Sequence, residues 1–133
     1  MCVRKLITIT ICFVIAAIIA CSRDKKTDFA AAKAAKEYYD LLLREDYNGF
    51  VEGMNMPERI PDSYREQLVD NARMFVGEVG QERQGIREVR VVNCVNDSAM
   101  LSANAFLMIC FGDSTIEEVV VPMVKRGKKW YMK

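Results

Sequence analysis

Few residues of this 133-residue chain have side chains that could do chemistry. The sequence contains no histidine, which excludes Ser-His-Asp and Cys-His nucleophile systems and every His-ligated metal site. The candidates that remain are 5 cysteines and 18 carboxylates. Acidic and basic residues nearly balance, at a formal net charge of +1, so the chain has no strong field for nucleic acid. We therefore expect no nucleic-acid partner, no metal centre and no cofactor.

The cysteine at position 21 has the most distinctive surroundings. A basic start over 1–5 precedes an uncharged apolar stretch over 6–20, which is shorter than the roughly 20 residues of a membrane span but typical of a signal peptide. The stretch ends Ile18-Ile19-Ala20-Cys21-Ser22, which resembles the bacterial lipobox. That resemblance implies cleavage before Cys21, diacylglycerol on its thiol, and a fatty acyl chain such as palmitate on the new amino group.

A lipid on Cys21 predicts a protein of the bacterial cell envelope. The expected organisation is a lipoprotein signal peptide over 1–20, a lipidated polar tether over 21–28 and one folded domain over 29–133. Several acyl chains, at about 0.8 kcal/mol per buried CH₂, form a stable membrane anchor. In some bacteria an aspartate after the lipidated cysteine marks retention in the inner membrane, and this chain has Ser22 at that position. The sequence therefore favours the outer membrane, where the domain would face the periplasm or the cell surface. The alternative is an ordinary signal peptide or an uncleaved anchor helix, with Cys21 incidental.

Two further cysteines, Cys94 and Cys110, belong to the predicted folded domain. An exported protein meets oxidising conditions, so a disulfide between them has to be considered. The strands predicted below place them tens of ångströms apart, at about 3.3 Å per residue. A disulfide needs Cα atoms within about 7 Å. The sequence therefore predicts two free, mostly buried thiols and no disulfide.

After the tether, the spacing of apolar residues predicts three helices. The first runs over 29–45 and is capped by Thr27 or Asp28, and the second is short and capped by Asp46. The third opens at Pro61 and runs to about residue 79, where Gly80 ends it. Its apolar positions form one stripe: Tyr64, Leu68, Ala72, Phe75 and Val79.

From residue 86 the pattern changes to that of β-strands. Strands are expected over 86–95, 99–111, 115–125 and 128–133. Two-residue turns at Asn96-Asp97, Gly112-Asp113 and Arg126-Gly127 would join them. The order predicts an α+β fold, with three N-terminal helices packed on one face of a four-stranded antiparallel sheet.

The alternation of residues along the strands assigns the two faces of the sheet. With two-residue turns, the face toward the helices holds Val89, Val91, Met100, Ser102, Asn104, Phe106, Met108, Val119, Val121, Met123, Trp130 and Met132. Ser102 and Asn104 interrupt this apolar face. Either they bond to each other, to the backbone or to buried water, or they line a pocket whose wall Phe106, Met123 and Trp130 complete.

The opposite face has a small apolar centre that is expected to be exposed. Its residues are Ala103, Ala105, Leu107 and Val120. An exposed patch of this kind predicts a homodimer that forms sheet to sheet. The alternatives are cover by the tether and an ordinary, partly apolar surface.

Two segments resemble a known domain family. Residues 38–50 (YYDLLLREDYNGF) are similar to the opening of nuclear transport factor 2-like (cystatin-like) domains, and residues 121–131 (VPMVKRGKKWY) are similar to their last hairpin. With the lipobox, the chain resembles small bacterial lipoproteins that carry such a domain of unknown function. The resemblance implies a cone of helices over a curved sheet, often dimeric through the outer face, in a superfamily that contains enzymes, transport adaptors and proteins without known activity.

These observations favour an exported, lipid-anchored binding or scaffolding module without catalysis, whose ligand is a small molecule or a protein. An isomerase- or cyclase-like enzyme of the same fold is one alternative, and would need an Asp or Glu buried beside Ser102 and Asn104. A purely structural homodimeric envelope protein is another.

Two turns carry weaker signals. The basic segment over 125–129 is either a solvated hairpin or a contact for anionic lipid head groups or glycan. Ser98 and Ser114 lie in short motifs that resemble bacterial O-glycosylation sites.

Overall fold

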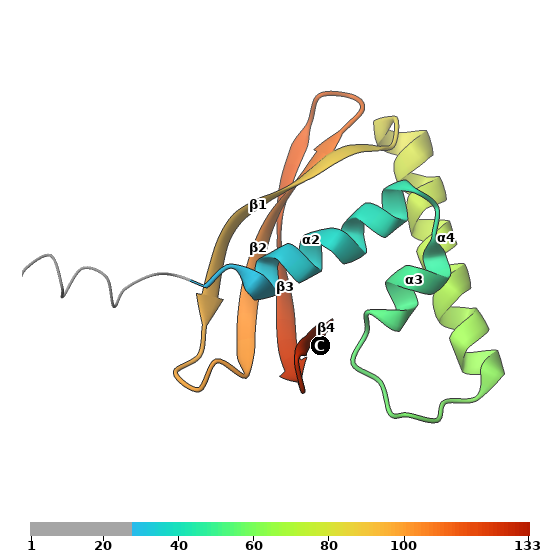
Figure 1. Ribbon diagram of the computed structural model, residues 1–133. Coiled ribbons are helices and arrows are strands. Elements are labelled where there is room, and N and C mark those ends of the chain that lie inside the picture. The colour runs from blue at the N-terminus through green and yellow to red at the C-terminus, as the bar shows by residue number, and fades with distance from the viewer. Residues whose placement is uncertain (1–27) are drawn as a thin grey trace, which may run out of the picture.

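The computed structural model of the protein describes residues 28–133. The predicted signal peptide, Cys21 and the tether up to Thr27 lie outside the described residues. Three helices precede four strands (Figure 1): α2 (Ala30–Leu43), α3 (Tyr47–Glu52), α4 (Asp62–Arg83), β1 (Ile86–Asn96), β2 (Ser102–Phe111), β3 (Ile116–Arg126) and β4 (Lys129–Met132). The strands form one antiparallel sheet in the order β1-β2-β3-β4, so the predicted α+β architecture is confirmed.

Helix α2 lies across the sheet, and its alanines make the close approach (Figure 1). Ala31, Ala32 and Ala35 are fully buried, and they belong to one hydrophobic cluster with residues of all four strands. Small side chains let the helix backbone come near the sheet while the strands supply the larger groups. The N-cap residue of α2 is Phe29, which makes no side-chain cap, and the Asp28 carboxylate before it accepts a hydrogen bond from the Ala30 N–H at 2.9 Å.

The other two helices follow local signals, with one correction. Asp46 caps α3 as predicted, because its side chain accepts from the Gly49 N–H at 2.9 Å. Helix α4 does not end at Gly80 but continues to Arg83. A glycine inside a helix costs only about 1 kcal/mol, and the turn out of the helix is made by Gln84 and Gly85, at φ 60° and 80°. The Gly85 N–H then donates to the Val79 carbonyl at 3.1 Å.

The sheet also differs from the prediction in the facing of β2. Val121, Met123, Trp130 and Met132 face the helices as expected and are buried. In β2, however, the residues that pair with Val121 and Met123 are the ones that face the helices. The helix-facing residues of β2 are Ala103, Ala105, Leu107 and Ile109, and those facing away are Ser102, Asn104, Phe106 and Met108.

An irregularity in β1 and the β2–β3 turn together explain this inversion. The β1–β2 connection is not two residues but a loop over 97–101, in which the Asp97 carboxylate accepts from the Leu101 N–H at 2.9 Å and the Ser102 hydroxyl at 3.0 Å. This loop moves the partner of Val95 from Ser98 to Asn104, an even shift that keeps the two on one face, whereas the register shift between Val91 and Asn93 changes which residues of β2 share a face with Val91. The β2–β3 connection is also longer, so that Cys110 pairs with Ile116. A register change by one residue moves every side chain to the opposite face. At the β3–β4 turn, Arg126 pairs with Lys129, a shift of two from the expected register. An even shift leaves each side chain of β4 on its predicted face.

The segment after α3 is fixed to the edge strand β4. The Met132 N–H donates to the Gly53 carbonyl, and the Asn55 N–H to the Met132 carbonyl, both at 2.7 Å. Tyr38 of α2 reaches the same place, because its hydroxyl donates to the Trp130 carbonyl at 2.7 Å. A Cβ at Gly53 would collide with the Tyr38 ring, so only glycine fits there.

We expect Gly53→Ala to lower the free energy of unfolding by about 1–3 kcal/mol, since overpacking costs that much where neighbours cannot move. The matched control is Gly77→Ala in α4, where a Cβ would meet nothing within 4 Å. That substitution should raise stability by about 0.5–1 kcal/mol, because alanine loses less backbone freedom than glycine in a helix. Urea denaturation of the two variants measures both effects, and equal changes would contradict the Tyr38–Gly53 contact.

Candidate functional site

The structure does not bring the five predicted pocket residues together. Ser102, Asn104 and Phe106 lie on the face of β2 that points away from the helices, whereas Met123 and Trp130 lie beneath them. A hollow of about 280 Å³ at this end of the sheet includes Ser102, Asn104 and Met123 in its lining. Phe106 and Trp130 are not part of its lining. The predicted pocket between sheet and helices is therefore wrong in its composition.

The predicted dimer face changes for the same reason. Ala103, Ala105 and Leu107 are buried under the helices and cannot form an outer surface. Val120 does face outward and is 51% exposed. It shares the exposed apolar surface of the sheet with residues such as Val92, Val95 and Ile116. Association of two copies through this surface stays a prediction.

An apolar groove, which we call the α4 groove, lies between α4 and the rest of the domain. It consists of three adjoining hollows of about 390, 340 and 350 Å³. Tyr39 lines all three, and Phe50, Met54, Leu68 and Phe75 each line two. Its other apolar walls include Leu42, Ala72, Val79, Val119, Val121 and Met132.

The groove exists because α4 is held mainly by α3 and makes little contact with the sheet. Of its 22 residues, Val69 and Ala72 are the buried ones. The predicted apolar stripe of α4 is present, but Tyr64 and Phe75 on it remain 48% and 41% exposed. The stripe therefore faces the domain core across a space that other side chains leave unfilled.

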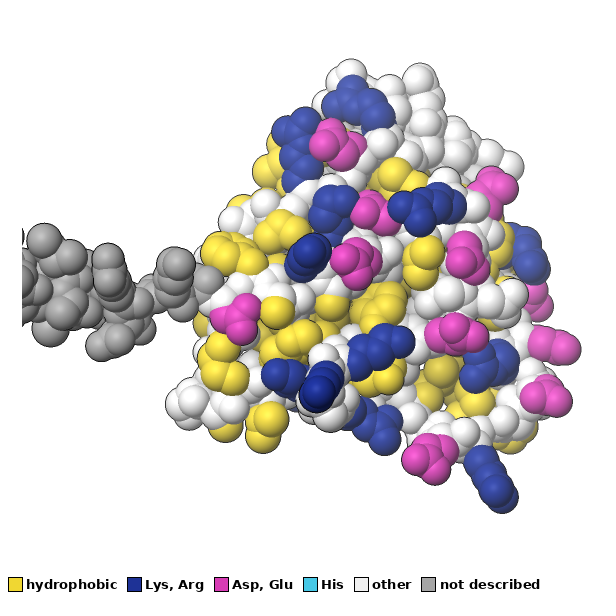
Figure 2. Space-filling view, viewed as in Figure 1, with side chains coloured by type: hydrophobic (Ala, Val, Ile, Leu, Met, Phe, Trp, Pro, Cys, Tyr) yellow, Lys and Arg dark blue, Asp and Glu magenta, His cyan; other side chains and the backbone are white. Residues whose placement is uncertain are grey.

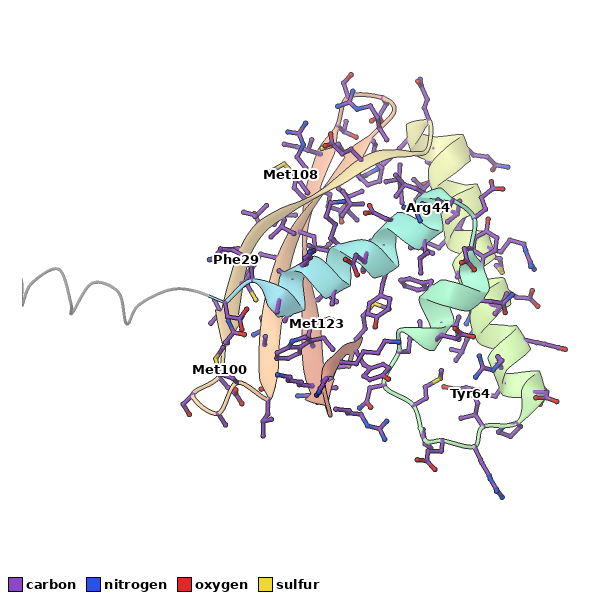
Figure 3. All side chains as sticks on the ribbon, viewed as in Figure 1. Phe29, Arg44, Tyr64, Met100, Met108 and Met123 are labelled. Carbon is purple, nitrogen blue, oxygen red and sulfur yellow. The ribbon has the colours of Figure 1, made fainter. Side chains whose placement is uncertain are left out.

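The two ends of the α4 groove differ in charge. One end is crossed by an ion pair from Arg83 of α4 to Glu117 of β3, with N and O atoms 2.9 Å apart. The Arg83 guanidinium also lies over the Phe111 ring, 4.4 Å from its centre. At the other end, Arg126 donates to the Asn55 side chain at 3.1 Å and the Met56 carbonyl at 3.2 Å. Tyr64 stands on the first turns of α4 beside that end (Figure 3).

The centre of the groove offers little acid–base chemistry. Its polar groups there are the Tyr39 hydroxyl and the Asn71 amide. Burial raises the pKa of Tyr39, so its hydroxyl stays protonated and can donate a hydrogen bond at neutral pH. The ring packs edge-on against Phe50, with centroids 5.7 Å apart. An apolar wall with one or two placed polar groups is the usual composition of a small-molecule site.

Charged groups stay at the surface throughout the part of the chain that the structure describes. None of residues 28–133 is a buried polar or charged residue, and no three Cys, Asp or Glu side chains there gather as a metal site would require. Cys94 and Cys110 are both free and buried. Within the same residues, no helix combines the length and apolar character needed to cross a bilayer.

The two predicted glycosylation positions are accessible. Ser98 lies in the β1–β2 loop and Ser114 in the β2–β3 turn, at φ 72°, and both are exposed. Their modification stays a prediction.

Sequence reasoning missed the α4 groove, although it identified many of its residues. Tyr64, Leu68, Ala72, Phe75 and Val79 were predicted to form one apolar stripe, and all five line the groove. What the pattern cannot give is how completely a stripe is covered.

The fold itself is known from other proteins. The structure resembles that of a "putative NTF2-like transpeptidase" from Campylobacter jejuni, with a TM-score of 0.60, 14% sequence identity, and coverage of 74% of this chain and 92% of that one. It also resembles a SEC-C motif containing protein from Rhodopseudomonas palustris, with a TM-score of 0.55, 16% identity, and coverage of 83% and 80%. No protein-family model and no curated protein sequence matches the chain.

At such low identity, these similarities establish the fold alone. The protein has a nuclear transport factor 2-like fold, as the two resembling segments implied. Proteins of one fold differ widely in what they bind and catalyse, so the fold assigns no activity.

Because burial raises the pKa of Tyr39, we expect a specific alkaline loss of stability. The hydroxyl ionises near pH 10 in the unfolded chain and at higher pH in the folded one, so the free energy of unfolding falls as pH rises above about 10. Tyr39→Phe removes this contribution and flattens the decline. Urea denaturation of the parent and variant between about pH 8 and pH 11 makes the measurement. If the free energy of unfolding declines with pH as steeply in the variant as in the parent, the Tyr39 hydroxyl is not desolvated.

Proposed function

We propose that this protein is an exported, lipid-anchored protein of the bacterial outer membrane, whose folded domain binds an apolar ligand of small-molecule size without catalysing a reaction. The anchor is the lipid that the lipobox-like segment implies for Cys21. The binding site is the α4 groove.

The observation that carries the binding role is the continuity of the α4 groove. Three hollows of 340–390 Å³ follow one another along α4 and share Tyr39. Ligand pockets of proteins typically measure about 300–1,000 Å³, so even one or two of these hollows would hold a small molecule. Moving an apolar ligand out of water into such a groove is favourable by roughly 25 cal/mol per Å² buried.

The alternative of an isomerase- or cyclase-like enzyme requires a carboxylate inside the cone. Among residues 28–133 no Asp or Glu is buried, and Ser102 and Asn104 lie on the outer side of the sheet. The Glu78, Glu82 and Glu117 carboxylates line only the end of the groove that Arg83 occupies. All three are exposed and Glu117 is paired with Arg83, so no carboxylate lines the apolar centre of the groove. We therefore favour binding over catalysis.

The anchor is tested by Cys21→Ser. We expect this variant to lose all incorporation of labelled palmitate in bacteria that make the protein, because the thiol is the attachment point for the lipid that must precede acylation. The matched control is Cys12→Ser, which changes a cysteine inside the predicted signal peptide and should leave labelling intact. Gel autoradiography measures the labelling of both variants. Equal labelling would rule out Cys21 as the lipidated residue.

The groove is tested by Phe75→Ala with the neutral fluorescent probe N-phenyl-1-naphthylamine. We expect the variant to bind the probe about three- to sevenfold more weakly, because the probe would cover the 41% of the Phe75 side chain that is exposed, and full burial of such a side chain contributes about 1.5–3 kcal/mol. Met74→Ala is the control, because Met74 is the neighbouring residue, is 62% exposed and does not line the three hollows. Fluorescence titration gives both affinities. Equal weakening in the two variants would place the probe elsewhere.

A further inference from the structure

The described chain begins at one end of the sheet, and hydrogen bonding fixes it there. The Asn96 side-chain N–H, at the end of β1, donates to the Asp28 carbonyl at 2.8 Å. Seven residue steps separate Asp28 from Cys21, which span at most about 25 Å when fully extended. A lipid on Cys21 therefore keeps this end of the sheet near the membrane surface.

The same end presents apolar side chains to solvent. The β1–β2 loop over 97–101 follows Asn96 directly, and its Met100 and Leu101 are 38% and 58% exposed. Phe29, the residue after Asp28, is 45% exposed. Figure 3 shows Phe29 and Met100 on the side of the molecule where the described chain begins.

The loop is held in this shape by Asp97. Its carboxylate is partly desolvated, but hydrogen bonds from the Leu101 and Ser102 N–H groups outweigh this effect and lower its pKa. Met100 has a φ of 57°, in the left-handed region that non-glycine residues rarely adopt. The exposed side chains thus belong to an ordered loop.

A basic hairpin lies directly beside this loop. The Lys125 N–H donates to the Leu101 carbonyl at 2.8 Å, which joins the end of β3 to the loop. The cations of the hairpin are Lys125, Arg126, Lys128 and Lys129. Figure 2 shows dark blue side chains gathered at the lower edge of the molecule, near the place of β4 in Figure 1, with hydrophobic side chains beside them.

The opposite end of the sheet has a different character. The β2–β3 turn and the start of β3 carry Asp113, Glu117 and Glu118. That end also carries Arg83, Arg87 and the exposed Ile116, so its charges are mixed, whereas the four cations of the hairpin stand together at the end where the tether leaves.

From this arrangement we infer that the β1–β2 loop and the basic β3–β4 hairpin form a docking surface for anionic phospholipid, which orients the domain on its own membrane. The inference rests on the proposed lipid anchor. Lys and Arg side chains are attracted to anionic head groups, while Met100 and Leu101 can enter the boundary between head groups and acyl chains. The anchor raises the local concentration of this surface at the bilayer, so a weak contact suffices for docking.

Hydrogen exchange of the full-length protein on vesicles tests the inference. The protein, purified with its lipid, is inserted into vesicles of phosphatidylcholine alone or of phosphatidylcholine with phosphatidylglycerol. We expect backbone amides of residues 97–101 and 125–129 to exchange more slowly on the anionic vesicles. Salt at about 1 M should remove the difference, because it shortens the screening length to about 3 Å.

Two pairs of substitutions separate docking from general charge. Lys128→Gln with Lys129→Gln should lower the ratio of docked to free domain about thirtyfold, since each cation near an anionic surface is worth about 1 kcal/mol. The matched control is Arg44→Gln with Arg87→Gln, which removes two exposed cations far from the hairpin, at the end of α2 and the start of β1. This control should keep the slow exchange.

The outcomes distinguish the inference from the anchor. The intact mass of the same sample reports whether Cys21 carries lipid, and its absence would overturn the anchor and the docking that depends on it. Lipid on Cys21 together with equal exchange on both vesicles would overturn the docking surface alone. Loss of slow exchange in both substituted pairs would also overturn the docking surface. The slow exchange would then depend on the net charge of the protein and not on the cations of the hairpin.

Discussion

The close approach of α2 to the sheet is the constraint on which the rest of the domain depends. Ala31, Ala32 and Ala35 have no exposed surface, and they allow the helix to lie directly on Ala105 and Leu107. A helix this close to the strands excludes α4 from the same surface. Helix α4 must therefore pack on α3, and the space between its apolar stripe and the sheet becomes the α4 groove.

A few polar contacts then keep α4 at a fixed distance from the sheet. Arg83 bridges to Glu117 at one end and lies over Phe111, which joins the last turn of α4 to β3 and β2. An exposed ion pair contributes little to stability on its own. Here its role is geometric, since together with the cation–π contact it defines where the groove ends. At the other end the segment after α3 is bonded to β4 through Gly53 and Asn55, which fixes the second wall.

Much of the architecture followed from local signals, because helices and strands depend on short-range periodicity and capping. The Asp46 cap and the alternation of β3 are of this kind. The facing of β2 did not follow, since it depends on the register shift in β1 between Val91 and Asn93 and on a one-residue shift in the β2–β3 pairing, neither of which a short motif specifies. The predicted pocket of Ser102 and Asn104 failed because of these two shifts. The α4 groove required knowledge of how helices cover one another, which is a property of the assembled chain.

The proposed groove and the proposed docking surface meet at Arg126. This residue belongs to the basic hairpin, yet its guanidinium donates to Asn55 and Met56, which line the groove. The end of the groove beside Arg126 carries no ion pair across it comparable to Arg83 with Glu117 among the described residues. Docking of the hairpin would therefore hold the more open end of the groove near the bilayer and its ion-paired end away from it. An apolar ligand that leaves a membrane could then enter the groove with little exposure to water, which removes the main free-energy cost of transferring such a molecule.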